Sequence, residues 1–211
     1  MAIKPILFNT EMVRSILDGQ KTCTRRVVKT RRKDACGFYV TKRPDGSFTG
    51  VYEYDEDERM FENQLIQYKP GDILYVRETW CKGSWGNEKE RYYYKADDND
   101  FYCTWHPSIH MPKEAARIWL KVTDVRVERL QDITDDGAKA EGANWKNGKN
   151  VGWEEKMKRT AVERFAEIWD STIKKSDLDR YGWDANPWVW VIEFERCERP
   201  EALKLKDREE N

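Results

Sequence analysis

The segment Ile118-Trp-Leu-Lys-Val-Thr-Asp-Val-Arg-Val-Glu-Arg-Leu130 says more about the fold than any other part of the chain. Its aliphatic residues occupy even positions as far as Val122 and then odd positions at Val125 and Val127. Because side chains alternate between the two faces of a strand, a straight strand cannot bury both sets. The pattern therefore predicts a bulge or bend near residues 123–124, and strands that bend in mid-course are typical of a small closed barrel.

The segments on either side alternate between helical and extended patterns. Apolar residues at helical spacing predict helices over residues 9–18, 134–141 and 153–173. Alternating or continuous apolar runs predict strands over residues 21–28, 38–42, 47–54, 73–78, 91–95 and 188–194. We therefore expect an α+β fold of the twisted, mainly antiparallel β-barrel type with flanking helices.

The composition indicates an ordered globular chain. Hydrophobic residues make up only 39% of the 211 residues, but aromatic residues reach 13% and include ten tryptophans, which is enough apolar surface for a core. We expect a single domain over residues 1–196, with insertions near 29–68 and 142–151, and a charged tail over 197–211. No apolar run approaches the roughly 20 residues of a membrane span, and no signal-peptide pattern is visible, so we expect a cytoplasmic location and no membrane partner.

Charge is segregated near the N-terminus although the net charge is only -1. Residues 1–43 contain eleven Lys and Arg against three Asp and Glu, whereas residues 44–63 contain one Arg against seven Asp and Glu. The basic stretch could contact phosphates of a nucleic acid. Alternatively, the acidic stretch folds back over the basic one.

The five cysteines occupy positions 23, 36, 81, 103 and 197 and include no C-x-x-C pair. Without a secretory signal we expect them to be reduced thiols. Cys103, His106 and His110, with Cys81 upstream, have residue types that ligate zinc. The C-x-x-C pair that usually supplies half of the ligands of a zinc site is missing, however, so we expect no metal and no cofactor. We expect His106 and His110 to make ordinary hydrogen bonds.

The densest group of reactive side chains is the segment Gly19-Gln-Lys-Thr-Cys-Thr-Arg-Arg26. Lys21 could act as a base in a desolvated setting, and Thr24 could then act as a nucleophile. Arg25 and Arg26 could bind phosphate or stack on a base. Lys21 and Thr24 would point to opposite faces of a regular strand, so this interpretation needs a loop or bend between them. The alternative is an ordinary basic strand on the surface.

Three further groups also have two interpretations. Arg77 and Glu78, at the end of a predicted strand, either line the mouth of a pocket or pair on the surface. Glu141, beside Gly142 at a helix end, either reaches into a cleft or is solvated. The aromatic residues of 181–188 either stack on a nucleobase or close the core.

Several short motifs occur in an order that resembles one known family. Gly19, Lys21, Thr24 and Arg26 form a Gly-x-Lys-x-x-Thr-x-Arg motif, and Pro-Gly-Asp precedes the strand over 73–78. The segment 133–142 matches Ile-Thr-x-x-x-Ala-x-x-Glu-Gly, and the final apolar strand ends in Glu-Phe. In this order the chain resembles the ASCH domain of the PUA-like superfamily. It is most similar to the longer bacterial and prophage ASCH proteins, whose location would be the host cytoplasm.

This resemblance implies a cleft suited to RNA or a nucleoside. Compact ASCH proteins include amidohydrolases that remove the acetyl group of N4-acetylcytidine with a lysine, a threonine and a glutamate, which correspond to Lys21, Thr24 and Glu141. In this hypothesis Lys21 activates Thr24, and Arg26 or backbone N–H groups stabilise the oxyanion. Stacking on Trp80 or Tyr75, with Arg25, Arg77 and Glu78 nearby, would hold the base.

Two other functions remain open at this stage. The same cleft could belong to a non-catalytic module that binds a modified or unpaired base in single-stranded RNA or DNA. A ribonuclease that uses the same residues is a weaker alternative. The sequence does not distinguish a free nucleoside from a polymer, and it does not indicate the oligomeric state.

Overall fold

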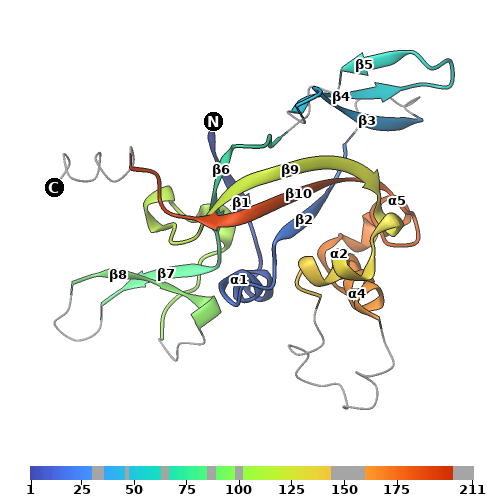
Figure 1. Ribbon diagram of the computed structural model, residues 1–211. Coiled ribbons are helices and arrows are strands. Elements are labelled where there is room, and N and C mark those ends of the chain that lie inside the picture. The colour runs from blue at the N-terminus through green and yellow to red at the C-terminus, as the bar shows by residue number, and fades with distance from the viewer. Residues whose placement is uncertain are drawn as a thin grey trace. The chain divides into compact units, whose positions relative to one another are not determined.

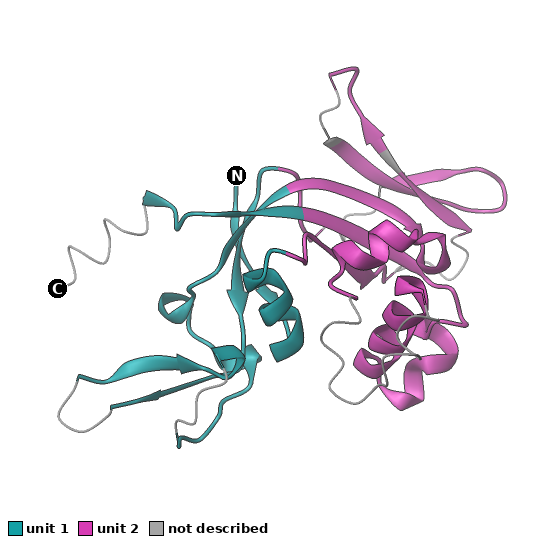
Figure 2. Cartoon of the chain, turned by 60° about the horizontal axis from the view of Figure 1, so that its bottom comes forward, with its two compact units in different colours: residues 1–19, 71–122, 194–211 teal, residues 20–70, 123–193 magenta. Residues whose placement is uncertain are grey.

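The computed structural model describes residues 1–29, 36–45, 48–62, 67–84, 89–97, 102–143 and 160–201, without the side chains of residues 40, 48 and 62. The chain forms two compact units (Figure 2). Unit 1 contains residues 1–19, 71–122 and 194–211, and unit 2 contains residues 20–70 and 123–193. Each unit is therefore assembled from segments that are far apart in the sequence.

The principal sheet has five strands in the order β1-β6-β9-β10-β2 (Figure 1). In unit 1, β1 (Ile3–Leu7) pairs in parallel with β6 (Ile73–Arg77), which pairs antiparallel with the first residues of β9 (Trp119–Arg129). In unit 2, β2 (Cys23–Val27) pairs antiparallel with residues 189–193 of β10 (Trp188–Cys197). The strands β9 and β10 contribute residues to both units.

Two smaller antiparallel sheets accompany the principal one. In unit 2, β3 (Gly37–Lys42), β4 (Phe48–Tyr54) and β5 (Met60–Glu62) form a three-stranded sheet. In unit 1, β7 (Trp80–Gly83) and β8 (Arg91–Tyr94) form a hairpin. The predicted α+β class is confirmed, with mixed and antiparallel sheets and a few helices. The closed barrel and the ASCH fold stay predictions.

The helices agree with the sequence patterns, with one correction. They are α1 (Thr10–Leu17), α2 (Asp135–Ala140), α4 (Ala161–Thr172) and α5 (Leu178–Tyr181). The predicted helix over 153–173 is wrong as a single continuous helix, because Thr160 and Glu163 form a capping box that begins α4 at Ala161. Residues 151–159 and most of the predicted insertion over 142–151 lie outside the described residues. Short 3₁₀ turns occupy Lys95–Asp97, Ser108–His110, Lys113–Ala115, Leu130–Asp132 and Lys175–Asp177.

The change of parity in β9 occurs where the sequence predicts it. Leu120 and Val122 are buried, Thr123 is exposed, and Val125 is buried. The strand nevertheless continues without a break from Trp119 to Arg129. The boundary between the two units falls at the same place, after Val122. One half of β9 therefore packs its aliphatic side chains into unit 1 and the other half packs them into unit 2.

Each unit has its own core. In unit 2, Phe165 and Trp169 of α4 pack with Val189 and Val191 of β10 and with Ala138 of α2. In unit 1 the core around β6 and β9 is formed by Ile73, Met111, Ala115, Ala116 and Trp119. No helix among the described residues is both long and apolar enough to cross a bilayer.

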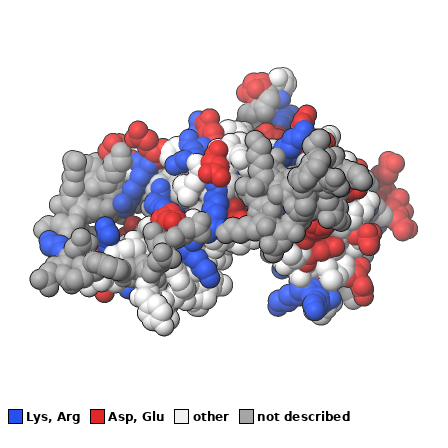
Figure 3. All heavy atoms as spheres, turned by 90° about the horizontal axis from the view of Figure 1, so that it is seen from below, with Lys and Arg blue, Asp and Glu red and all other residues white. Residues whose placement is uncertain are grey.

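Several basic residues of the N-terminal third form ion pairs with carboxylates that are distant in the sequence. Lys4, Lys21 and Lys42 form ion pairs with Asp72, Glu141 and Asp124, none of which belongs to the acidic stretch 44–63. In the view of Figure 3, Lys and Arg side chains lie next to Asp and Glu side chains over the described surface. Such a surface carries both signs of charge side by side.

Candidate functional site

The end of α2 and the start of β2 come together in unit 2. Thr134 caps α2 by accepting a hydrogen bond from the Gly137 N–H (3.0 Å). The helix ends at Glu141, because Gly142 adopts a φ of 85°, a conformation that glycine takes without strain. The Thr22 N–H donates to the Ala140 carbonyl (2.8 Å), which places the segment before β2 against this helix end.

Lys21 and Glu141 form a buried ion pair at this junction. The Lys21 Nζ donates to the Glu141 Oε2 (2.5 Å) and to the Glu141 carbonyl oxygen (3.0 Å). Their side chains are 0% and 4% exposed. Because removing both charges from water is costly, such a pair persists only where its geometry is well satisfied. The predicted strand over 21–28 begins only at Cys23, so Lys21 lies in the loop before β2 and is free of the alternation of a strand.

Arg25 holds the other oxygen of the same carboxylate. Its Nη1 donates to Glu141 Oε1 (3.3 Å), while its Nε and Nη2 donate to Glu128 Oε1 of β9 (3.1 and 2.6 Å). The guanidinium lies 5.8 Å from the centroid of the Phe165 ring. Arg25 is 4% exposed, and its donors are directed at protein carboxylates. In the structure the Arg25 guanidinium therefore contacts Glu128 and Glu141, and its contact with a substrate stays a prediction.

Thr24 and Arg26 lie on the opposite face of β2 from Arg25. The register pairs Thr24 with Ile192 and Arg26 with Trp190, and directly paired residues share a face of a sheet. Thr24 is buried. Among the described residues, no hydrogen bond joins its hydroxyl to Lys21 or Glu141. Lys21 and Glu141 are therefore in contact with each other, whereas Thr24 is close to Lys21 in the sequence and is hydrogen-bonded to neither residue.

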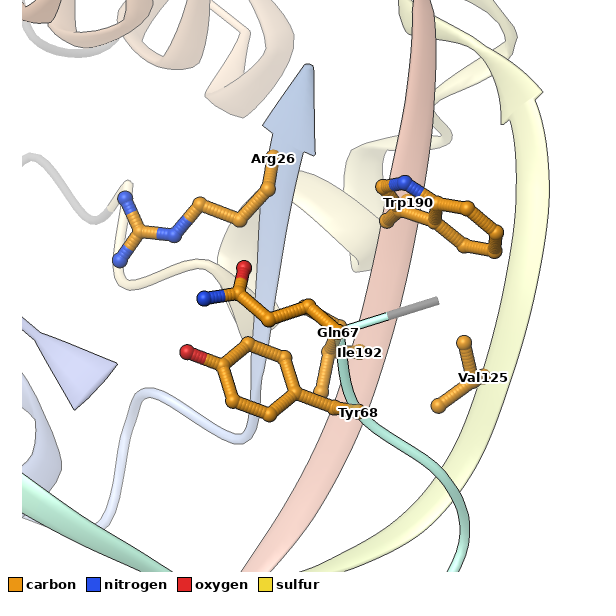
Figure 4. Close-up of a pocket in the computed structure, with 6 residues that line it drawn as sticks. All are labelled: Arg26, Gln67, Tyr68, Val125, Trp190 and Ile192. Atoms are coloured by element: carbon orange, nitrogen blue, oxygen red, sulfur yellow. The ribbon is translucent and has the colours of Figure 1, made fainter. Parts of the chain in front are cut away.

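The face that carries Thr24 and Arg26 also lines a pocket. Its lining residues are Arg26, Gln67, Tyr68, Val125, Trp190 and Ile192. Figure 4 shows the polar ends of Arg26, Gln67 and Tyr68 turned to one side, with Trp190 and Val125 on the other. Desolvation lowers the pKa of the Arg26 guanidinium, although the negative charge of Glu141 opposes this shift. Burial likewise raises the pKa of the Tyr68 hydroxyl, which therefore stays protonated at neutral pH.

The thiol of Cys23, at the start of β2, is not an activated nucleophile. Burial, reinforced by the charge of Glu141, raises the pKa of Cys23 to about 12. Since the thiolate is the reactive form, Cys23 stays inert at neutral pH.

The other predicted site residues lie in unit 1. Glu78 is 1% exposed and accepts two hydrogen bonds from Arg117 (2.9 and 3.0 Å). Burial raises the pKa of Glu78, and Arg117 opposes that shift. Arg77 donates to the Met111 carbonyl (2.7 Å), Trp80 lies against Tyr92 and His106, and Tyr75 lies against Trp119. The contacts named here lie within unit 1, and a role of these four residues in binding stays a prediction.

The expectation of five reduced thiols is wrong, because Cys81 and Cys103 form a disulfide. A disulfide sulfur is not available as a thiolate ligand, so Cys103, His106 and His110 do not form the zinc site considered above. Within the described part of the chain, no group of three or more His, Cys, Asp or Glu residues is arranged to hold a metal ion. His106 instead pairs with Trp80 through two backbone hydrogen bonds (2.7 and 3.2 Å).

Sequence reasoning did not single out Glu128, Gln67, Tyr68 or Trp190. No sequence motif indicates Glu128, because its role is to accept hydrogen bonds from Arg25, which lies far from it in the sequence. Trp190 belongs to a continuous apolar run that indicates only a buried strand. Tyr68 precedes the Pro-Gly-Asp turn, and that turn was the one signal that the chain returns to the sheet there.

Comparisons with known proteins do not assign a family. No family model matches the chain. No curated protein matches it either. One solved structure that resembles it is the crystal structure of hypothetical protein PH0355, with 14% sequence identity over 93% of this chain and 100% of that chain and a TM-score of 0.40. A likeness of this degree carries no argument about fold or function.

Proposed function

We propose that the protein recognises a nucleobase or nucleoside and hydrolyses amides of the N4-acetylcytidine type with Lys21, Thr24 and Glu141. The buried Lys21–Glu141 pair is the observation that carries this proposal. A lysine and a carboxylate held 2.5 Å apart out of water place a base and an acid within hydrogen-bond reach of each other. The resemblance to ASCH proteins supplies the reaction class.

In the first step Thr24 attacks the acyl carbonyl. With the pair in its neutral form, the Thr24 hydroxyl gives its proton to the Lys21 amine while its oxygen bonds to the acyl carbon. Glu141 then gives its proton to the departing N4 nitrogen as the C–N bond breaks. The products are free cytidine, an acyl ester on Thr24, an ammonium on Lys21 and a carboxylate on Glu141.

In the second step water reverses these changes. Glu141 takes a proton from water, whose oxygen attacks the ester carbonyl, and Lys21 returns its proton to the Thr24 oxygen as acetic acid departs, which then gives its proton to solvent. In both steps backbone N–H groups or Arg26 would stabilise the oxyanion. Thr24 must approach Lys21 when substrate binds, and catalytic hydrogen bonds commonly shorten only in the substrate complex.

Hydrolysis of N4-acetylcytidine tests this proposal directly. Release of cytidine is followed by chromatography for the native protein and for Lys21→Ala, Glu141→Ala and Lys139→Ala. Lys139 is the matched control, because it lies on the same helix but pairs with Asp135 at the surface. Turnover that is lost in the first two variants and retained in the third supports the proposal. Absence of turnover by the native protein at high concentration contradicts it.

One observation favours a second function, a binding module without catalysis. The Lys21 ammonium directs two hydrogen bonds at Glu141, and Thr24 is not bonded to either residue. A lysine that is held by Glu141 in this way can position the surrounding residues of a binding site without transferring protons. Such a module would bind single-stranded RNA or DNA with an affinity that falls steeply as salt rises, whereas a site for a free nucleoside would respond weakly to salt.

A further inference from the structure

The three-stranded sheet of unit 2 carries a row of tyrosines outside the candidate site. Tyr39 of β3 pairs with Tyr52 of β4, and directly paired residues share a face of a sheet. Tyr54 lies two residues further along β4, so it shares that face. Met60 of β5 pairs with Tyr54 and joins them. We call these four residues the tyrosine face.

The opposite face of this sheet is the buried one. Phe38 and Val51 are 7% and 0% exposed, and the Phe38 ring meets the Trp188 ring edge-on with centroids 5.7 Å apart. The three tyrosines are partly exposed, and Met60 is 60% exposed. The solvated face of an antiparallel sheet normally carries polar side chains. Tyr and Met are instead enriched at protein interfaces, so the tyrosine face has the composition of a binding surface.

The rings of the tyrosine face are packed against one another. Tyr39 and Tyr52 stack with centroids 5.8 Å apart and ring planes 19° apart, and the centroids of Tyr39 and Tyr54 are 6.2 Å apart. The Tyr54 ring lies against Gly37, where a Cβ would collide with it, so only glycine leaves room for the ring. The three rings therefore present a continuous aromatic surface instead of three separate side chains.

Other aromatic rings of unit 2 are covered by cations of the chain itself. Arginine guanidiniums lie over the rings of Phe165, Trp188 and Tyr181, at 5.8, 4.4 and 5.1 Å from the centroids. Over the tyrosine face, by contrast, no Lys or Arg of the described residues lies on a ring. Because a tyrosine ring attracts cations through its quadrupole, these rings can take the cations of a partner.

Exposed carboxylates adjoin the tyrosine face. The turn from Tyr54 to Met60 carries Glu56, Asp57 and Glu58 at the surface, where Arg59 pairs with Asp57 (3.2 Å). The stretch 44–63 as a whole contains seven Asp and Glu against one Arg. A surface of this charge attracts a basic partner and repels the phosphates of a nucleic acid.

We propose that the tyrosine face is a docking surface for an arginine-rich polypeptide segment. Arginine side chains of the partner stack on Tyr39, Tyr52 and Tyr54, and neighbouring basic side chains pair with the carboxylates of residues 56–58. Arginine suits this surface better than lysine, because its planar guanidinium stacks on a ring while its N–H groups donate to carboxylates. The residues of this surface are separate from the Lys21–Glu141 pair, so the inference does not depend on the proposed function.

Fluorescence anisotropy with labelled probes tests this proposal. The probes are three peptides of equal length, in which Arg, Lys or Ser alternates with Gly, and a single-stranded oligothymidine. We expect the Arg peptide to bind most tightly and the Lys peptide more weakly, because lysine stacks less well on aromatic rings. The Ser peptide and the oligothymidine should not bind to this face.

Paired variants separate the aromatic from the acidic contribution. Tyr39→Leu should weaken binding of the Arg peptide about tenfold, whereas Tyr39→Phe keeps the ring and should stay within about twofold of the native protein. Glu56→Gln/Glu58→Gln should weaken binding about threefold to tenfold and make it less sensitive to salt. Asp179→Asn/Asp184→Asn is the matched control, because it removes two exposed carboxylates elsewhere in unit 2.

The results distinguish a basic polypeptide from other occupants of this face. Binding of the Arg peptide that Tyr39→Leu and the double Gln variant both weaken supports the proposal, provided that the Asn control binds normally and circular dichroism shows every variant folded. Equal affinity for the Arg and Ser peptides, or an Arg-peptide affinity that Tyr39→Leu leaves unchanged, overturns it. Oligothymidine binding that Tyr39→Leu abolishes would assign the face to a nucleic acid. A native dimer that this substitution dissociates would assign it to a second copy of the chain, and either result also overturns the proposal.

Discussion

Lys21 and Glu141 are 120 residues apart in the sequence, yet the Nζ of one lies 2.5 Å from the Oε2 of the other in the interior of unit 2. Beside this contact lie the Thr22–Ala140 backbone hydrogen bond and the helix end at Gly142. The stability of the folded protein should therefore depend on the presence of both charges of this buried pair.

Removing one partner should therefore destabilise the protein more than removing both. Lys21→Met leaves Glu141 buried with Arg25 as its remaining cation, and we expect the free energy of unfolding to fall by about 3 kcal/mol. The double variant Lys21→Met/Glu141→Leu should lose less than the sum of the two single variants. Urea denaturation of all four proteins measures this coupling. Strict additivity would show that the two residues are energetically independent.

Arg25 should tolerate replacement poorly, even by another cation. A lysine ammonium cannot reach Glu128 and Glu141 in the way that the Arg25 fork does, so Arg25→Lys should cost about 1–3 kcal/mol. Arg126→Lys is the control, because Arg126 is 38% exposed and its ion pairs with Glu128 and Glu193 contribute at most about 1 kcal/mol. Thermal unfolding compares the two variants. Equal losses would mean that burial of the fork is unimportant.

The buried thiol of Cys23 should affect stability at alkaline pH. Its pKa in the folded protein, about 12, lies above the ordinary value of 9.0, so the unfolded chain loses this proton first as the pH rises. The contribution is fully present below pH 9.0 and is lost as the pH rises toward 12. The free energy of unfolding of Cys23→Ala should consequently fall less steeply between these limits.

Alkylation gives a second measurement of the same thiol. At pH 8, native protein should react with iodoacetamide at the exposed Cys36 and be protected at Cys23, as mass spectrometry of peptides can show. Rapid alkylation of Cys23 in the folded protein would contradict its assigned burial.

The Cys81–Cys103 disulfide should stabilise unit 1. It closes a loop with a sequence separation of 22, for which chain entropy gives about 3 kcal/mol. Reduction with dithiothreitol, or the Cys81→Ser/Cys103→Ser variant, should lower Tm, whereas Cys36→Ser should not. If reduction leaves Tm unchanged, the bond does not contribute to the folded state in solution.

Gly142 should be required for the site as well as for the helix end. Both Gly142 (φ 85°) and Gly19 (φ 72°) adopt conformations that strain other residues, so each Ala variant should lose about 1–2 kcal/mol. Only Gly142→Ala should also alter nucleoside binding or turnover, because it adjoins Glu141. Measuring stability and nucleoside binding in both variants separates an effect on the candidate site from the loss of stability that either substitution causes. Equal effects on binding would contradict this.

The sequence predicts what local periodicity encodes. The parity change between Val122 and Val125, the Asn9 cap of α1 and the apolar run of β10 each indicate an element that the structure contains. The strands β1, β5 and β7 were not predicted, although β2, β6 and β8, which have similar lengths, were. The interruption at Thr160 was not predicted, because the helical spacing of apolar residues continues across the capping box that begins α4.

The site was predictable only where a motif carried it. Lys21 and Glu141 were grouped by their order in the chain, and the structure brings them into contact. Tyr75, Arg77, Glu78 and Trp80 were grouped with them by residue type, although their contacts lie in unit 1. Residue type alone cannot show which carboxylate an arginine will reach, and for this reason Glu128 and Arg117 were not foreseen.

The sharing of β9 and β10 by both units has a consequence for synthesis on the ribosome. Unit 2 needs residues 188–193 to pair with β2, and unit 1 includes the chain from residue 194 onward. A nascent chain that has not yet exposed β10 therefore cannot complete either unit. Both units are therefore expected to complete folding only after β10 has emerged, and the edge of β2 that pairs with β10 stays exposed until then.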